Sequence, residues 1–258
     1  MPSKLLNEEV IEVYPYEMLA HFYDELMIHV NYKKWAQYID EIIKSQNISN
    51  ARILDISCGT GTLLIFLYKK GYKVSGSDIS KNMINTAISK IRNLGYDINF
   101  FQTDMRKLSL KKKFNVIVCL YDSINYILTC KEFINTLNNV YFSLSDNGIF
   151  IFDVCTEYNS IKNFYDYYDS GETADFFYQR HSFFIKEDML QINTFRILSK
   201  KNNKMYLENH KQRIYTTDEL NSIISKTEFT TIGMFDNYSF NPPGIKSERI
   251  HFVLRKKI

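Results

Sequence analysis

The residues with the clearest chemical potential are two glycines and two aspartates at separate points along the chain. Gly59 and Gly61 follow a short apolar run, and because they lack a Cβ they let a ligand approach the backbone. Asp78 stands 19 residues after Gly59, a spacing at which an acidic side chain can accept hydrogen bonds from both hydroxyls of a ribose. Asp104 suits an acceptor for the exocyclic amine of adenine, with Met105 packed on the ring. Together these residues predict an adenosine-binding site.

Two phosphate-binding alternatives fit the glycine loop less well. A dinucleotide fingerprint would place a third glycine where Leu64 stands, and a phosphate loop would need Gly-Lys followed by Ser or Thr, which this loop lacks. The adenosine site is therefore expected without a pyrophosphate. Either aspartate taken alone could instead be a turn residue or a helix cap, so the prediction depends on their order and spacing.

A parallel sheet is needed to bring these residues together. Apolar runs at 52–56, 72–77, 98–102, 114–120 and 149–155 predict five strands. The run 114–120 is nearly all apolar, as expected of a central strand covered on both faces. Segments of helical spacing lie between the runs, one of them with Ser80 as N-cap, and the turn at 146–148 is expected to end the last of them. The alternation predicts an α/β fold with a doubly wound, mostly parallel sheet.

The remaining segments complete the predicted domain plan. Apolar residues within 19–30 and 35–43 recur at helical spacing and predict two amphipathic helices. Residues 175–215 are predicted to form three antiparallel strands. Thr216 and Glu219 are expected to form a capping box at the start of a helix. Two further strands near 229–235 and 249–254 would bring the main sheet to seven strands. We expect an N-terminal helical cap (1–46), a sheet domain (47–172 and 216–258), and an inserted antiparallel cover (173–215) over the carboxyl edge of the sheet.

Composition describes an ordinary soluble globular protein. The 258 residues are 45% hydrophobic and 24% charged, and the net charge of +3 gives no reason to expect a nucleic-acid partner. Nothing resembles a signal peptide or a membrane span. The four cysteines form no CxxC pair and the five histidines no HxxxH or HxH spacing. We therefore expect reduced cysteines, a cytoplasmic location and no metal site.

Four motifs in succession resemble those of class I S-adenosylmethionine (SAM)-dependent methyltransferases: ILDISCGTG (53–61), GSD (76–78), QTDM (102–105) and FNVIVC (114–119). Ser57 departs from the pattern, since many members have Gly or Ala there. The resemblance implies SAM as cofactor, with Gly59 and its neighbours at the methionine part, Asp78 at the ribose, and Asp104 and Met105 at the adenine. The full set of cofactor-binding residues expected from it is Tyr16, Tyr23, Trp35, Ser57, Cys58, Gly59, Gly61, Asp78, Ile79, Met83, Asp104, Met105 and Leu120.

A narrower resemblance comes from LAHFYD (19–24), YDSINY (121–126) and the strand-rich insertion. Together they look like the branch that contains amino-sugar N,N-dimethyltransferases and glycine N-methyltransferase-like enzymes. In that branch an N-terminal tyrosine closes over the cofactor, which by position would be Tyr16 or Tyr23. Ordinary helix packing is the alternative for both tyrosines.

The sequence thus predicts methyl transfer to a small molecule, most simply at an amine nitrogen, by an enzyme that positions the nucleophile and excludes water. An O-methyltransferase, a peptide N-terminal amine as acceptor, a SAM-binding protein without turnover and a dehydrogenase are the alternatives, and a monomer or homodimer is expected. The catalytic candidates are Tyr23, Asp122 and Asn125; the substrate-facing candidates are Tyr126, Asp153 and Arg180. For the residues of the 121–126 loop the alternative is a structural role, in which they cap backbone amides.

Overall fold

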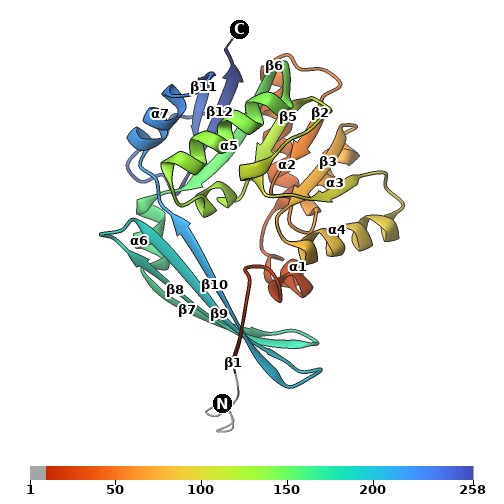
Figure 1. The fold of residues 1–258 in the computed structure, drawn as a ribbon, viewed down its shortest axis with the longest axis vertical. Coiled ribbons are helices and arrows are strands. Elements are labelled where there is room, and N and C mark those ends of the chain that lie inside the picture. Colours follow the sequence, from red (N-terminus) through yellow and green to blue (C-terminus); the bar gives the residue numbers. More distant parts are fainter. Residues whose placement is uncertain (1–9, 258) are drawn as a thin grey trace.

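A seven-stranded sheet forms the larger part of the computed structural model, which describes residues 10–257 (Figure 1). Its strand order is β11-β12-β6-β5-β2-β3-β4. The first five strands in chain order run parallel, while β12 is antiparallel to both β6 and β11. The strands are β2 (Arg52–Asp55), β3 (Lys73–Asp78), β4 (Asn99–Gln102), β5 (Phe114–Cys119), β6 (Leu144–Cys155), β11 (Phe229–Asp236) and β12 (Arg249–Lys256). The predicted fold class is confirmed.

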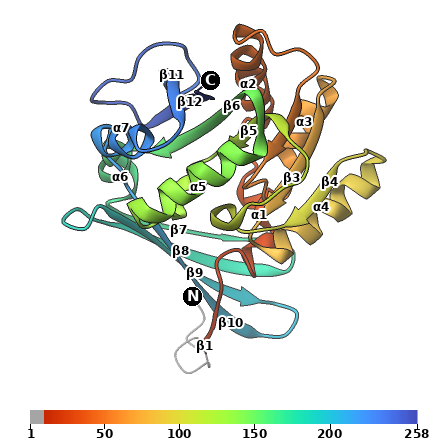
Figure 2. The same ribbon diagram turned by 45° about the horizontal axis from the view of Figure 1, so that its top comes forward.

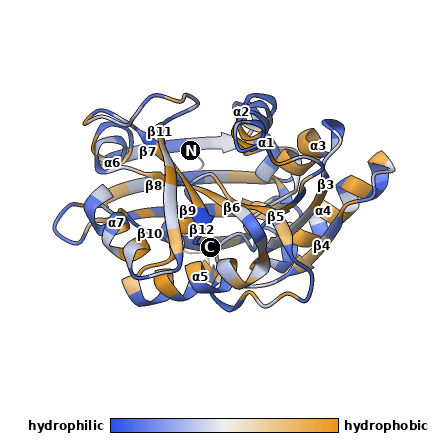
Figure 3. Ribbon diagram, turned by 90° about the horizontal axis from the view of Figure 1, so that it is seen from above, coloured by the Kyte–Doolittle hydropathy of each residue, from blue (hydrophilic) through white to orange (hydrophobic). Residues whose placement is uncertain are grey.

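Helices cover both faces of this sheet, because successive residues of the central strands point to opposite sides. On β5, Val116 and Val118 join the cluster beneath α2 (Tyr32–Ser45), α3 (Thr62–Lys69) and α4 (Lys81–Leu94). Ile117 and Cys119 join the cluster beneath α5 (Cys130–Ser143) and α7 (Thr217–Ser225). The outer side of α2 is largely hydrophilic (Figure 3).

A second, antiparallel sheet lies across the carboxyl edge of the first, as Figures 1 and 2 show from two sides. It contains β7 (Asp166–Glu172), β8 (Phe176–Ile185), β9 (Leu190–Ser199) and β10 (Lys204–Arg213), and it is reached through α6 (Glu157–Phe164). The N-terminal strand β1 (Val10–Val13) pairs in parallel with β10. The cover therefore has two strands more than expected. Most residues of β7 are exposed. Its sequence therefore lacks the alternation of apolar and polar residues that indicates a half-buried strand.

The segment 19–30 does not form the single amphipathic helix that its spacing predicts. It contains the short 3-10 helix η1 (Leu19–His21) and the four-residue helix α1 (Tyr23–Leu26), separated by Phe22 at a φ of −133°. Leu19 and Phe22 pack on Phe176, Phe195 and Ile197 of the antiparallel sheet. The apolar spacing therefore reflects burial against that sheet rather than a long helix.

The turn expected at 146–148 also takes a different form. Helix α5 ends at Ser143 and β6 begins at Leu144, so these residues lie inside the strand. The pairing of β5 with β6 shifts register between Phe114 and Val116, and Asn147 adopts a positive φ of 59°. The Asp-Asn-Gly sequence thus makes an irregularity in β6 rather than a loop before it.

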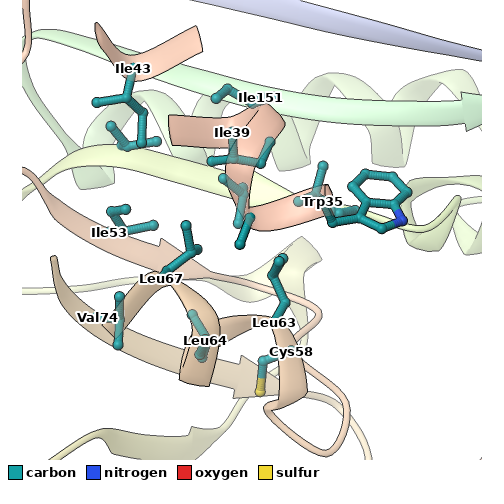
Figure 4. Packing of buried hydrophobic residues seen from close by; sticks show 14 of the residues in the cluster. Trp35, Ile39, Ile43, Ile53, Cys58, Leu63, Leu64, Leu67, Val74 and Ile151 are labelled. Carbon is teal, nitrogen blue, oxygen red and sulfur yellow. The ribbon is translucent and has the colours of Figure 1, made fainter. Parts of the chain in front are cut away.

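Gly76 allows α3 to pack closely on β3. A Cβ at this position would stand 2.7 Å from Leu64 Cδ1 and 2.8 Å from both Cys58 Sγ and Phe100 Cε1. The close helix–strand contact that a dinucleotide fold obtains with a glycine on the helix is obtained here with a glycine on the strand. Figure 4 shows Leu64 and Cys58 in this core together with Trp35, Ile39, Ile43, Ile53, Leu63, Leu67, Val74 and Ile151.

Replacing Gly76 by alanine should therefore overpack the core and lower the free energy of unfolding by about 1–3 kcal/mol. Urea unfolding measures the change. Gly244→Ala is the matched control, because nothing stands within 4 Å of a Cβ at Gly244 and its stability should be unaltered. Equal stability of the two variants would contradict this account of the packing.

Candidate active site

A cavity of about 550 Å³ opens at the carboxyl ends of β2, β3 and β4. This is within the size range of pockets that hold small ligands, roughly 300–1,000 Å³. Seven of the predicted site residues line it: Tyr16, Ser57, Asp78, Ile79, Asp104, Met105 and Tyr126. The fold therefore gathers residues that lie far apart in the chain around one space.

Asp78 ends β3 with its side chain turned toward the glycine loop. Its Oδ2 accepts a hydrogen bond from the backbone N–H of Gly59 at 2.9 Å, and its Oδ1 accepts one from Ser80 N–H at 2.9 Å. Burial raises the pKa of the carboxyl, against the lowering effect of these hydrogen bonds. Each oxygen keeps a lone pair for a further donor, so the side chain can still accept hydrogen bonds from two neighbouring hydroxyls.

Asp104 also lines the cavity, just beyond β4, and is paired with Arg106. The carboxylate accepts hydrogen bonds from the backbone N–H, Nε and Nη2 of Arg106, the last at 2.7 Å. Burial alone would raise the pKa of Asp104, but the hydrogen bonds from Arg106 outweigh it and hold the pKa below its usual value. Asp104 thus stays an ionised acceptor beside Met105. Its contact with an adenine amine stays a prediction.

A smaller cavity of about 60 Å³ shares Ser57 and Ser123 with the larger one. Gly59 contributes backbone to it and adopts a φ of +52°, a conformation that favours glycine. Aromatic and aliphatic side chains line much of it: the predicted Tyr23, Trp35 and Leu120 and the unpredicted Tyr32, Leu63 and Tyr121, together with the predicted Cys58. Such walls suit a cationic sulfur compound better than basic groups would.

Asp55 is the acidic residue of this smaller cavity, and the sequence analysis did not single it out. It ends β2, is 3% exposed, and accepts a hydrogen bond from the backbone N–H of Ser57 at 3.0 Å. Burial raises its pKa to about 7. Its position at the carboxyl end of a strand, directly before the glycine loop, was the available signal. A ligand cation placed beside it would favour the ionised form.

Two further predicted cofactor residues support the loop and do not line either cavity. Met83 is 2% exposed on α4, with its Sδ 4.0 Å from the place where a Gly59 Cβ would be. Gly61 precedes α3 at a φ of 77°, and Phe100 stands where its Cβ would be. Their direct contact with a cofactor stays a prediction.

The loop after β5 is held by a buried ionic cluster. Tyr121 and Asp122 both adopt left-handed backbone conformations, and Asp153 on β6 accepts hydrogen bonds from both of their N–H groups. Arg249 on β12 forms ion pairs with Asp153 and with Asp122, the latter at 2.7 Å. Gln212 on β10 donates to the other Asp122 oxygen at 2.7 Å. Neither carboxylate is left without partners.

Asn125 and Arg180 also have partners within the protein. The Asn125 side chain is fully buried, donates to the carbonyl of Arg213 and accepts from the N–H of Cys155. Arg180 on β8 donates to Ser182 and Asn193. Catalysis by Asp122 and Asn125, and substrate contact by Asp153 and Arg180, stay predictions; the contacts present hold the loop and the antiparallel sheet in place.

Tyr16 and Tyr126 face each other across the mouth of the larger cavity, with their hydroxyl oxygens 2.8 Å apart. Tyr23 packs edge-on against Tyr16, with ring centroids 5.8 Å apart. Burial raises the pKa of all three tyrosines, so their hydroxyls stay protonated. The two candidates for the N-terminal closing tyrosine thus both reach the site, one at each cavity.

The structure also describes the state of the cysteines, the grouping of possible metal ligands and the length of the apolar helices. All four cysteines are free, and three of them are buried. Among residues 10–257, no three His, Cys, Asp or Glu side chains are grouped to hold a metal ion, and no helix is long and apolar enough to cross a membrane.

Comparison with known proteins gives a consistent result. Residues 53–148 match the model of a family described as a methyltransferase domain. YqeM of Bacillus subtilis (strain 168), whose name assigns it provisionally to the methyltransferases, is 30% identical over 244 residues, which cover 93% of this chain and 97% of YqeM. A SAM-dependent methyltransferase from Clostridium acetobutylicum has a crystal structure similar to this one, with a TM-score of 0.81, 26% identity, and coverage of 94% of this chain and 99% of that one.

A more distant structure shares the fold. The X-ray structure of a sugar N-methyltransferase from Streptoalloteichus sp. ATCC 53650 aligns with a TM-score of 0.74 at 15% identity, covering 100% of this chain and 98% of that one. The alignment therefore includes the antiparallel cover as well as the parallel sheet.

Proposed function

The chain belongs to the class I SAM-dependent methyltransferases, and on that premise we propose that it transfers a methyl group from SAM to the amine nitrogen of a small molecule. In this proposal the larger cavity takes the adenosine against Asp78 and Met105, and the smaller takes the methionine part against Gly59 and Asp55. When bound, SAM supplies an electrophilic methyl group on a positively charged sulfur.

The observation that carries the amine assignment is that Tyr16 and Tyr126, which line the larger cavity, offer an acceptor protonated hydroxyls rather than a base in direct contact. The tyrosine hydroxyls keep their protons, and Asp122 and Asp153 are occupied by Arg249. A neutral amine can attack without a base, because it loses its proton only after the new bond has formed. A hydroxyl acceptor needs a base in contact with it as the bond forms.

Enclosure of the site favours a small acceptor. The antiparallel sheet covers the carboxyl edge of the parallel sheet, and β10 contacts the loop after β5 through Gln212 and His210. A nucleic acid would need this cover displaced. The aligned enzyme from Streptoalloteichus supports the same interpretation, since it is named as a sugar N-methyltransferase.

Mass spectrometry of paired acceptors tests the proposal. The purified chain is incubated with SAM and either a nucleotide-linked amino sugar, other small amines, or the same compounds with a hydroxyl in place of the amine. We expect methyl addition to an amine only, and much slower addition with an Asp78→Asn variant at SAM concentrations below saturation. Addition to the hydroxyl partners alone would overturn the assignment of nitrogen as the acceptor atom.

Asp55 makes a second, pH-dependent prediction about the cofactor. Because its pKa is about 7 in the ligand-free protein, a ligand ammonium group beside it binds best to the ionised form. Affinity for S-adenosylhomocysteine should therefore be constant above about pH 7 and fall by up to about tenfold per pH unit below it. The stability of the ligand-free protein should change in the opposite direction. Because folding raises the pKa of the Asp55 carboxyl, its ionisation is less favourable in the folded state, and the free energy of unfolding should fall as pH rises toward 7.

Isothermal titration at several pH values measures this dependence. Asp55→Asn should bind more weakly at pH 8 and should lose the slope near pH 7. Asp97→Asn, at an exposed site, is the control and should keep the wild-type profile. A slope that persists in Asp55→Asn would assign it to another group.

A further inference from the structure

Three polar side chains point from β10 into the interior, which is unusual for the inner face of a strand. Glu208, His210 and Gln212 alternate along β10 and are 0%, 2% and 7% exposed. Gln212 holds Asp122, as described above. Glu208 and His210 take no part in the cofactor cavities, yet burying such groups is unfavourable unless their hydrogen bonds are satisfied.

These two residues continue the tyrosine pair into a single chain of hydrogen bonds. The Tyr16 and Tyr126 hydroxyls are 2.8 Å apart, Tyr126 Oη lies 2.8 Å from His210 Nδ1, and His210 Nε2 lies 3.1 Å from Glu208 Oε2. Four side chains from three separate segments therefore connect the cavity mouth to a buried carboxylate.

The donors around Glu208 fix the direction of this chain. Backbone N–H groups of Tyr16, Met18 and Leu19 all donate to its carboxylate, so its oxygens act as acceptors. His210 must then donate through Nε2, which leaves Nδ1 as an acceptor for the Tyr126 hydroxyl. Tyr126 oxygen in turn accepts from Tyr16, and the Tyr16 oxygen keeps a lone pair for a donor in the cavity.

We propose that Tyr16, Tyr126 and His210 form a relay that removes the proton of the methylated amine, with Glu208 as the positioning residue that sets the histidine tautomer. This inference rests on the proposed function. The amine lone pair forms the C–N bond while the C–S bond breaks and its electron pair stays on sulfur. The resulting ammonium gives a proton to Tyr16 oxygen, the Tyr16 proton passes to Tyr126, and the Tyr126 proton passes to Nδ1 of His210.

The surroundings of His210 suit the end of such a relay. Glu208 stabilises the imidazolium that forms, and the aromatic rings of Phe195, Tyr16 and Tyr126 pack around the imidazole. The nearest further charges that act on the two tyrosines are Asp122 and Asp78. Since the tyrosine hydroxyls stay protonated, they pass a proton along the chain instead of storing a negative charge.

Nitrogen NMR of histidine-labelled protein tests the geometry without any acceptor, in the presence of S-adenosylhomocysteine. We expect His210 as the tautomer protonated at Nε2, with a hydrogen-bonded Nδ1 whose resonance moves downfield in Tyr126→Phe. A tautomer protonated at Nδ1 would overturn the relay, whatever the acceptor is.

Turnover of a nucleotide-linked amino sugar tests the chemistry. His210→Gln should lower kcat at neutral pH, because the methylated ammonium can then lose its proton only to solvent, with unchanged affinity for S-adenosylhomocysteine and a protein that is still folded at the assay temperature. Its kcat should also keep rising with pH beyond the wild-type plateau, because solvent base must then take the proton. A merely structural role would lower kcat without changing the pH profile.

The control is His181→Gln, on β8 of the same sheet, where the histidine is partly exposed and pairs with Asp166; it should retain wild-type kcat. Wild-type kcat and pH profile in His210→Gln would overturn the relay. If the wild-type protein methylates no amine, the proposed function fails instead, and the NMR result alone decides whether the hydrogen-bond chain is directed as stated.

Discussion

Replacing Asp78 by asparagine should weaken SAM binding roughly 10- to 150-fold, which corresponds to about 1.5–3 kcal/mol for hydrogen bonds to a charged group. The carboxylate receives Gly59 N–H on one oxygen and Ser80 N–H on the other, and its remaining lone pairs would take both ribose hydroxyls. An amide would turn an N–H toward one of these backbone donors. The variant thus loses an acceptor and disturbs the loop at the same place.

Isothermal titration with SAM and S-adenosylhomocysteine measures the loss, after circular dichroism has shown that the variant is folded. Asp97→Asn again serves as the matched control and should bind as the wild type does. Unchanged affinity in folded Asp78→Asn would reject the ribose assignment. It would also remove the main reason for placing the adenosine in the 550 Å³ cavity.

Replacing Arg249 by methionine should be the most destabilising of the changes considered, lowering the free energy of unfolding by about 3–5 kcal/mol. Arg249 pairs with Asp122 and Asp153 at once, and Asp153 is fully buried. Methionine fills much of the same space but leaves two neighbouring carboxylates without a cation. Their mutual repulsion and their burial then act together against the folded state.

Urea unfolding at neutral pH gives the size of this effect. The triple variant Arg249→Met, Asp122→Asn, Asp153→Asn should recover a large part of the lost stability, since it removes the unpaired charges. Arg92→Met, at an exposed position on α4, should have nearly wild-type stability. A loss below about 1 kcal/mol for Arg249→Met would mean that the cluster is hydrated and does not behave as a buried ion pair.

The position of Asp78 and Asp104 beside one cavity could be predicted because each lies at the end of a strand in a segment that carries its own signal. Asp78 ends an apolar run, and Asp104 follows another. In a parallel sheet the carboxyl ends of the strands meet at one edge. The alternation of strands and helices was therefore enough to place both aspartates at the same edge of the sheet.

The contacts around the loop after β5 and along β10 could not be predicted in this way. Arg249 meets Asp122 across 127 residues of sequence, and Glu208 meets the N–H of Tyr16 across 192. The alternation along β10 puts Glu208 and His210 on the same face, but only the tertiary fold decides that this face points inward. A strand whose inner face is polar reads as an exposed strand when only its sequence is known.

The structure of the N-terminal segment also could not be predicted from its local spacing. Leu19 and Phe22 carry apolar spacing that favours a helix, yet they pack on the antiparallel sheet, and Glu208 takes up the N–H groups that begin the segment. Tertiary contacts here override the local preference. They also bring Tyr16 to the cavity, which a continuous helix across 19–30 would not require.

Thermal unfolding with SAM, S-adenosylhomocysteine, NAD and ATP in parallel tests the central claim most directly. A ligand at 100 times its Kd should add about 2.7 kcal/mol to the stability, a rise in Tm of about 2–4 °C for a chain of this size. The account predicts this rise with SAM and S-adenosylhomocysteine, and a rise at most about half as large at the same ligand concentration in Asp78→Asn. Stabilisation by NAD or ATP, with none by the two sulfur compounds, would contradict it.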